Sequence, residues 1–486
     1  MDNEKGMSLT KEEKKKRREA KELERLRREQ AKPKPKGYIA YFIFLISLLY
    51  IIDEVTSAIG PQMQSVLAAK LVAPVVGEDF AIARMSLITG TANMMGLVAF
   101  LYKPLADRYG RKKFLIINTI GMAMGMMFIG TAAGIPGYAI GIAIITFFIP
   151  HDMHAVYIFE SVPAKHRAKI YAVIKAVAVA GALSIPLLRN LFMPGGDTSG
   201  WRGVYLVPMA AAFVVAVVAA FFIRESDAYV ENRIQQLTMG DQLDTMSKKE
   251  KEEAQARGGI IKAVKTVFAH KQLRWLILAS CIFSGGVLMT LYYEPTLNLG
   301  YVSGYIAEGM TQEAAATAAV AAVTKALVTF TVGSACIQLI QGFLSDSIGR
   351  KASSIIMAIA ALGSFALFFV GANHVWNPYF VGLLAGVAVG GYYAACDINI
   401  IMISESTPTN LRSSVMTVQS ITSMIVIMPV SIIYMIVVNL LGDAMIAQTC
   451  LIIAIPLMAL GMLILWMKTK ETKGTDMTNV QKNNFE

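Results

Sequence analysis

The stretch KPLADRYGRK at residues 103–112 recurs, altered but recognisable, as GFLSDSIGRK at residues 342–351. Each copy keeps an aspartate, then a glycine, then two basic residues, and the copies lie 239 residues apart. A second stretch, YIFESVPAKHR at residues 157–167, recurs 245 residues later as MISESTPTNLR at residues 402–412. A weaker third pair begins at Glu54 and at Glu294, 240 residues apart. Ordered repeats at nearly constant spacing predict that the chain consists of two copies of one unit.

The composition places both units in a membrane. The chain has 486 residues, of which 55% are hydrophobic and 16% charged, and its mean hydropathy is +0.52. Soluble domains carry about 25% charged residues, and a helix of about 20 apolar residues spans a bilayer. The sequence therefore excludes a soluble enzyme. Twelve apolar blocks are long enough to span, six on each side of a charged break: 38–60, 86–104, 114–133, 137–159, 168–191, 203–223, 274–297, 318–344, 352–371, 377–403, 413–441 and 445–467.

These blocks predict an all-α membrane protein with twelve transmembrane helices in two pseudo-symmetric six-helix bundles. The expected units are a basic arm (1–36), a first bundle (37–223), a central loop (224–273), a second bundle (274–467) and a tail (468–486).

The net charge of +11 collects on one side of the predicted spans. By the positive-inside rule this side is cytoplasmic, which predicts a multi-pass protein of the cell membrane with both termini in the cytoplasm. The arm, with its run from Lys14 to Arg18, is expected to touch anionic lipid rather than nucleic acid. Four cysteines without CxxC spacing predict neither a disulfide framework nor a zinc site.

The two GRK-containing copies resemble the signature of the major facilitator superfamily. Other motifs narrow the resemblance within this family. The ExxPxxxR stretches at 160–167 and 405–412, and the motifs at 224–226, 292–296 and 470–474, are similar to those of the sugar-porter branch and its metabolite–proton symporter neighbours. The resemblance implies alternating access, with the solute bound near the bilayer midplane between the halves.

The resemblance also implies a charge network that holds the cytoplasmic side shut, with simple positive-inside anchoring as the alternative. Lys103 replaces the first glycine of the family motif, which predicts a looser helix approach at that corner. The residues expected in this gate are Asp107, Arg108, Gly110, Arg111, Glu160, Arg167, Asp346, Gly349, Arg350, Glu405 and Arg412.

Ionisable residues inside the apolar blocks are the candidates for binding solute or protons. Placing each of them in the bilayer costs at least about 2.5–3.5 kcal/mol, so by default such a residue marks a functional site. The candidates are Asp53, Glu54, Asp152, Lys175, Glu294 and Asp397. The alternative is internal ion pairing, with Lys175 neutralising one carboxylate. His151 and His154 flank Asp152; we expect a proton relay there rather than a metal site.

The resemblance also indicates the class of solute, because this sequence replaces residues that the family uses to bind sugar and couple protons. Asp53 aligns with the coupling aspartate of proton-linked sugar porters, but its usual arginine partner falls at Ile140. A sugar-contacting glutamine falls at Lys175, and a helix-ten proline at Asp397. These replacements favour a charged or zwitterionic metabolite over a neutral hexose.

We therefore expect a monomeric, proton-coupled secondary transporter of a small polar metabolite, without a cofactor and without enzyme activity. Three alternatives stay open: a proton-driven exporter of cationic compounds, a sugar:proton symporter, and a non-transporting membrane nutrient sensor.

Overall fold

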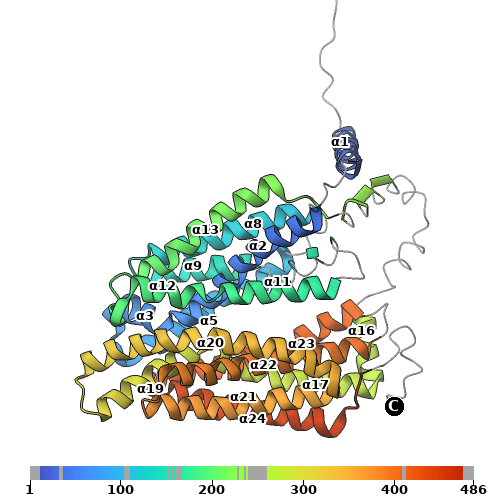
Figure 1. Ribbon diagram of the computed structural model, residues 1–486. Helices are drawn as coiled ribbons and strands as arrows, with labels where there is room; N and C mark the ends of the chain where they lie inside the picture. The colour runs from blue at the N-terminus through green and yellow to red at the C-terminus, as the bar shows by residue number, and fades with distance from the viewer. Residues whose placement is uncertain are drawn as a thin grey trace, which may run out of the picture.

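The computed structural model describes residues 11–31, 37–102, 110–149, 154, 157–158, 161, 167–226, 229–231, 233–234, 237–238, 260–407 and 412–473. Figure 1 shows two helical layers, the first and second bundles, lying one against the other. Helix α1 (Lys11–Ala31) and the last described residues lie at one end of the bundles, here called the arm end. The opposite end, where α3 and α19 lie, is the distal end.

The first bundle contains the helices that follow α1. They are α2 (Tyr38–Gln62), α3 (Gln64–Leu67), η1 (Ala68–Val72), α4 (Ala73–Val76), η2 (Glu78–Phe80), α5 (Ala81–Asn93), α6 (Met95–Tyr102), α8 (Arg111–Gly130), α9 (Ile135–Phe148), α11 (Arg167–Gly181), α12 (Ser184–Phe192), η4 (Pro194–Gly196) and α13 (Trp201–Phe222).

The second bundle repeats this order with longer elements. They are α16 (Ile260–Ala269), α17 (Lys271–Phe283), η5 (Ser284–Gly286), α18 (Val287–Leu291), α19 (Tyr293–Ala307), α20 (Gln312–Ile348), α21 (Arg350–Asn373), α22 (Pro378–Glu405), α23 (Arg412–Leu441), η6 (Asp443–Met445) and α24 (Ile446–Lys468).

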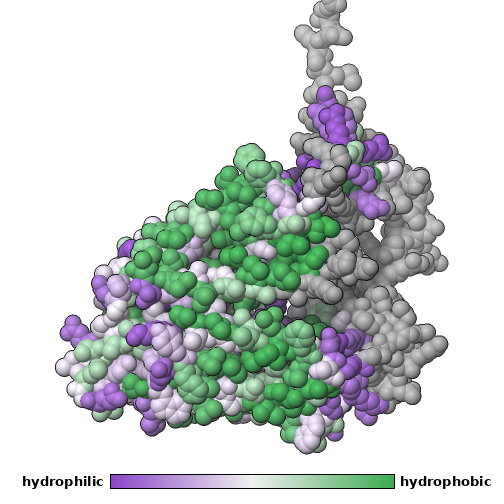
Figure 2. Space-filling view, viewed as in Figure 1, coloured by the Kyte–Doolittle hydropathy of each residue, from purple (hydrophilic) through white to green (hydrophobic). Residues whose placement is uncertain are grey.

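Ten helical segments of the described chain are long and apolar enough to cross a membrane. The shorter α5 with α6, and α9, occupy the other two predicted spans. The prediction of a twelve-helix, two-bundle membrane protein is therefore confirmed. In the face shown in Figure 2, apolar side chains cover the flanks of both bundles, whereas polar side chains gather at the distal end, at the arm end of the second bundle and on α1.

Several predicted spans are interrupted or extended. Helix five breaks between α11 and α12, and helix seven breaks into α17, α18 and α19 before continuing to Ala307, beyond its predicted end at residue 297. The first segment of helix four, α9, ends at Phe148, because Ile149 adopts an extended backbone (ψ 117°) ahead of Pro150; residues 154 and 157–158 are helical again. A residue before proline is driven out of the helical region by the proline ring.

The buried cores show where the bundles meet. One core contains Met63 and Ile82 of the first bundle together with Tyr292, Tyr434 and Ile446 of the second. The other large cores each belong to one bundle: residues from Phe42 to Ile223 at the arm end of the first, and residues from Ala263 to Leu465 in the second. The distal ends therefore share one packed interior.

Candidate functional site

Lys175 and Asp397 form an ion pair that joins the two bundles. Nζ of Lys175, on α11, lies 3.5 Å from Oδ2 of Asp397, on α22. The two side chains keep 33% and 39% of their surface exposed, so the pair is accessible to water. Each residue lies eight positions from the arm end of its helix, about 12 Å along the axis. This depth approaches the middle of a hydrocarbon core about 30 Å thick.

The surroundings of this pair add a carboxylate and an aromatic hydroxyl. The hydroxyl of Tyr393 lies within electrostatic reach of both Asp397 and Glu54, the latter being a half-buried residue of α2. That hydroxyl also donates a hydrogen bond of 3.3 Å to Oγ1 of Thr290. Two carboxylates against one ammonium leave this site with a negative balance when all three groups are charged.

Asp53 lies beside His154 in the interior of the first bundle. Nδ1 of His154 is 3.6 Å from Oδ2 of Asp53, and both side chains are fully buried. The imidazole stacks on the ring of Tyr50 with centroids 5.0 Å apart. Ile140, where the family's arginine would fall, is 49% exposed. A histidine further along helix four therefore faces Asp53 and is able to carry the positive charge.

Glu294 is held by Arg189, a residue that the sequence reading missed. Nη1 of Arg189 lies 3.4 Å from Oε1 of Glu294, and both side chains are fully buried. Oε2 of Glu294 accepts hydrogen bonds from the backbone N–H and the hydroxyl of Ser65. Arg189 lay inside the predicted span 168–191, so the rule that flagged Lys175 would also have flagged it.

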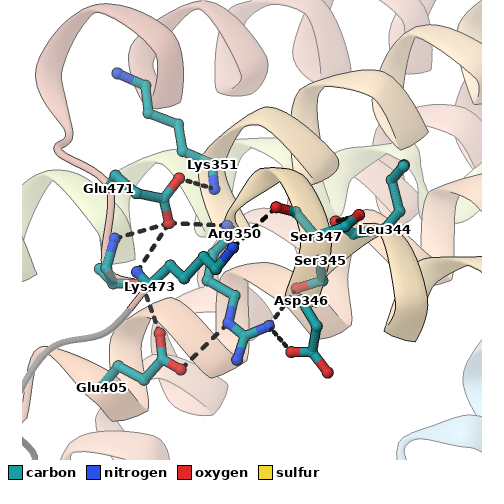
Figure 3. A network of polar contacts seen from close by, with 10 residues as sticks. Leu344, Ser345, Asp346, Ser347, Arg350, Lys351, Glu405, Glu471 and Lys473 are labelled. Atoms are coloured by element: carbon teal, nitrogen blue, oxygen red, sulfur yellow. Dashed lines mark hydrogen bonds and ion pairs between the residues drawn. The ribbon is translucent and has the colours of Figure 1, made fainter.

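Among the residues predicted for the gate, the described ion pairs lie within the second bundle. Nε of Arg350 lies 3.2 Å from Glu405 and Nη1 lies 2.5 Å from Asp346, while Thr472 donates a 2.6 Å hydrogen bond to Glu405 (Figure 3). In the described part of the chain, the hydrogen-bond and ion-pair partners of Arg350 belong to its own bundle, so this network does not join the halves in this conformation. Arg350 gains from both carboxylates, which raise its pKa against the opposing effect of burial.

Several other predicted residues cannot be placed. Asp107, Arg108, Asp152 and Glu160 lie outside the described residues. Arg167 and Arg412 begin α11 and α23, at matching points of the repeat, but their side chains also lie outside the described part of the structure.

Gly349 and Gly110 do more than permit a turn, because each precedes a helix that a remote glutamate caps. Gly349 has φ 104° and precedes α21, whose first backbone N–H groups donate to Glu471: Arg350 N at 2.8 Å and Lys351 N at 3.0 Å (Figure 3). Gly110 has φ 109° and precedes α8, where the N–H of Lys112 donates to Glu225 at 3.0 Å. A remote glutamate thus caps the third helix of each half.

A Cβ atom at either glycine would push the capping glutamate from its place. At Gly349 it would lie 2.6 Å from Oε2 of Glu471, and at Gly110 it would collide with Oε2 of Glu225. Glu225 and Glu471 belong to the motifs at 224–226 and 470–474, so the motifs that follow helices six and twelve cap α8 and α21.

A metal site finds no support among the described residues, where no group of three histidine, cysteine or carboxylate side chains is placed to hold an ion. His151 lies outside that set.

Comparison with known proteins gives the family. The sequence model of the Major Facilitator Superfamily matches residues 37–324. The chain is 25% identical over 305 residues to the glucose transporter GlcP of Staphylococcus epidermidis, covering 57% of this chain and 65% of that protein. It is 32% identical over 133 residues to the multidrug resistance protein MdtG of Proteus mirabilis, covering 27% and 32% respectively. The chain thus spans less than two thirds of the length of these relatives.

Solved structures agree on the fold. The inward-open xylose transporter XylE from E. coli superposes with a TM-score of 0.60 at 16% identity, covering 91% of this chain and 99% of that chain. The nucleoside transporter NupG superposes with a TM-score of 0.59 at 12% identity, covering 88% and 100%. At these identities the likeness supports the twelve-helix fold alone.

Proposed function

Because the chain belongs to the major facilitator superfamily, a family of membrane transporters rather than enzymes, we propose that it is a proton-coupled secondary transporter of a small charged or zwitterionic metabolite. The proposal rests on one observation above all: a half-exposed ion pair, Lys175 with Asp397, that bridges the two bundles at mid-depth. Alternating access requires contacts between the bundles that a solute is able to replace, and this pair meets that requirement.

A zwitterionic solute is the natural competitor for such a pair. Its carboxylate replaces Asp397 as the partner of Lys175, and its ammonium group replaces Lys175 as the partner of Asp397. The exchange keeps both protein charges paired, which matters because an unpaired charge at this depth is costly. A neutral sugar offers no replacement for either partner and leaves the pair in place.

The buried pair of Asp53 and His154 supplies a place for the coupling proton. With both side chains fully buried, the first bundle favours the state in which their charges cancel. Gain or loss of one proton leaves a net charge there. Proton binding at this pair and solute binding at the interface are then coupled through α2, which carries both Asp53 and Glu54.

The test is uptake into liposomes that contain the purified protein, under an imposed pH gradient. A panel of amino acids, organic acids, amines and neutral sugars identifies the solute class. Lys175→Met and Asp397→Asn should each reduce zwitterion uptake at least tenfold. Lys325→Met is the matched control, because Lys325 is exposed on α20 with no ion pair to a described residue. Equal uptake by wild type and both site variants would refute the assignment.

Asp53→Asn separates binding from coupling. It should abolish uptake driven by the pH gradient but retain exchange of labelled for unlabelled solute without a gradient. Loss of both activities would place Asp53 in solute binding instead, and retention of driven uptake would remove it from proton coupling.

Export of cationic compounds is the second candidate. The surplus of carboxylates favours it, since Glu54 and Asp397 both lie within electrostatic reach of Tyr393. It predicts that the same liposomes, loaded with a lipophilic cation, lose it when protons are supplied from outside, and that Glu54→Gln slows this loss. The partial similarity to a multidrug resistance protein agrees with this candidate, and that to a glucose transporter with a sugar:proton symporter.

The proposal also covers the orientation of the protein in the membrane, its lipid contacts and its oligomeric state. We place the arm end in the cytoplasm of the cell, following the basic residues, with α1 against anionic headgroups and the transporter working as a monomer.

A further inference from the structure

Arg189 is the largest fully buried side chain of the described structure, and the proposed transport site does not use it. It lies on α12, at the distal end of helix five. Its Nη1 donates to the carbonyl of Gln62 in its own bundle, whereas its Nε donates to Oγ1 of Thr324 in the second bundle at 3.2 Å. Together with the Glu294 ion pair, these contacts make Arg189 a direct bridge between the bundles.

Glu294 completes the bridge from the other side. It belongs to α19 of the second bundle, but among the described residues its side chain accepts hydrogen bonds only from the first: from Arg189, and from the N–H and hydroxyl of Ser65 at 3.0 and 2.9 Å. Each bundle therefore contributes one buried charge, and each charge has its partner in the opposite bundle.

A second polar contact closes the same end. Asp443, in η6 of the second bundle, accepts hydrogen bonds of 2.8 Å from the backbone N–H groups of Ile82 and Ala83, in the first turn of α5. Asn439 adds a 3.1 Å hydrogen bond to the carbonyl of Ala83. The shared core of Met63, Ile82, Tyr292 and Tyr434 surrounds this region, so the distal side is shut by packing as well as by polar contacts.

We propose that Arg189, Glu294 and Ser65 form a reversible latch of the distal side, which must open whenever the solute exchanges there. A buried ion pair suits a latch. Closed, the two charges pair with each other, although Nη2 of Arg189 has no hydrogen-bond partner among the described residues. Open, both charges regain water, so the contact adds little net barrier in either direction. Apolar groups of equal size would hold the closed state more firmly, because opening exposes them to water. The latch rests on the alternating access proposed above, but not on the identity of the solute.

This reasoning predicts opposite results for single and double substitutions. Arg189→Met or Glu294→Leu leaves one charge buried without its partner, which favours the open state where water reaches that charge. The double variant removes both charges and leaves an apolar contact, which favours the closed state. A role in local packing alone would instead make the double variant worse than either single one.

The measurement is the distance between spin labels on the two bundles, by pulsed electron paramagnetic resonance in nanodiscs without solute. Ser199→Cys and Glu313→Cys suit the labels, because both are exposed at the distal end. The segments that carry them touch, since a Cβ at Gly196 of η4 would collide with the carbonyl of Thr317. The background lacks the four native cysteines.

Each single variant should raise the ratio of long to short distances at least fivefold over the parent, and the double variant should return it to the parental value or below. Lys271→Met, which removes an exposed cation at the arm end of α17, should leave the ratio unchanged. Unchanged distances in both single variants would overturn the latch.

Ser65→Ala keeps the proposal testable where a single charge variant does not fold. It removes one hydrogen bond to Glu294 but preserves both charges, and it should raise the ratio about twofold. A parental ratio in this variant would likewise count against the latch. Because no solute is present, failure here is distinguishable from failure of the proposed transport activity, which the liposome assay reports.

Discussion

At the scale of the residue, the gate loops depend on two glycines whose backbone conformation other residues avoid. Gly349 has φ 104° and ψ 162°, a region that is essentially restricted to glycine and costs other residues about 1–3 kcal/mol. The carboxylate of Glu471 also fills the space that a Cβ would need. Conformation and packing thus require the same residue.

Gly349→Ala should therefore destabilise the protein, whereas Gly342→Ala in the same motif should not. Gly342 lies within α20, is exposed, and has no atom within 4 Å of its Cβ position. Alanine there should be neutral or stabilising by up to about 1 kcal/mol. Thermal unfolding of both variants in detergent compares the two positions directly. Equal stability of the two variants would mean that the loop relaxes to accept a side chain at Gly349.

The sequence predicted most of the charges that lie inside the bundles, but not how they pair. Lys175 and Asp397 were predicted because charges stand out within apolar blocks, and the structure pairs them. Arg189 carried the same signal and was missed. Which carboxylate meets which cation was beyond reach, because Lys175 and Asp397 are 222 residues apart, on helices of different bundles. Such pairing depends on how the bundles are set against each other, which no local pattern contains.

At the scale of the element, two helices of the repeat begin with the same device but in different electrostatic settings. Burial is the main influence on Glu225 and raises its pKa, although the N–H groups of Lys112, Ser226 and Arg111 oppose it. Burial also opposes ionisation of Glu471, but four backbone N–H groups outweigh it and lower the pKa of this carboxyl. The cap on α21 is thus the more favourable one for a charged glutamate.

The two caps should respond differently to neutralisation. A lowered pKa means that Glu471 contributes stability that is present above its unfolded pKa and is lost as the pH falls through its folded pKa. A raised pKa means that Glu225 favours the folded state only while protonated, and that this contribution is lost as the pH rises. At pH 7, Glu471→Gln should lower the melting temperature by about 2 °C, the effect of losing about 1 kcal/mol of capping.

Glu225→Gln is the matched comparison and should leave the melting temperature at pH 7 unchanged or slightly raised. The deficit of the Glu471 variant should shrink towards about pH 4, where glutamates in the wild type take up protons. A deficit of equal size in both variants at pH 7 would show that capping geometry outweighs burial at Glu225.

Helix α1 docks on residues 229–230 and 233 with its described basic side chains exposed. Leu26 is buried against Tyr229 and Val230, and Glu22 pairs with Arg233 at 3.0 Å. On the described part of α1, the glutamates that face the protein are half-buried, whereas the exposed face is basic except for Glu24. That face contains Arg17, Lys21, Arg25, Arg27 and Arg28. Docking thus turns a mixed sequence into a basic surface beside the arm end (Figure 1).

In nanodiscs with anionic lipid, amide hydrogen exchange over residues 11–31 should be slower than in neutral lipid. The difference should disappear at 1 M salt, where the screening length falls to about 3 Å. Arg233→Gln should speed exchange in both lipids, since it removes the partner of Glu22 but keeps the basic face. Equal exchange in the two lipids at low salt would limit α1 to its contacts with the protein.

At the scale of the whole molecule, duplication and hydropathy were sufficient for the architecture. Most predicted span ends fall within a few residues of the observed helices, because charged breaks and bilayer thickness fix them. The interruptions of helices five and seven were not predicted. They keep apolar composition across the break, as in Cys281–Leu291, so hydropathy does not register them. The protein is shut at its distal end. This state depends on how the bundles tilt, and no local sequence pattern predicts it.

Transport by alternating access requires the bundles to part at the distal end, and a covalent bridge there should stop it. A thiol-reactive cross-linker between Ser199→Cys and Glu313→Cys joins the segment after η4 to α20. These two segments touch where Gly196 meets Thr317. It should reduce the flux found in liposomes at least tenfold, and a reducible linker should restore that flux on cleavage.

The control bridge joins Ser199→Cys to Thr131→Cys within the first bundle. Both positions are exposed, and their segments are in contact, since Arg202 donates a 2.9 Å hydrogen bond to the carbonyl of Gly130. This bridge leaves the bundles free to move, so flux should persist. Persistent flux with the first bridge in place would mean that solute leaves without distal opening, and the two bundles would then not work as rigid bodies that part at this end.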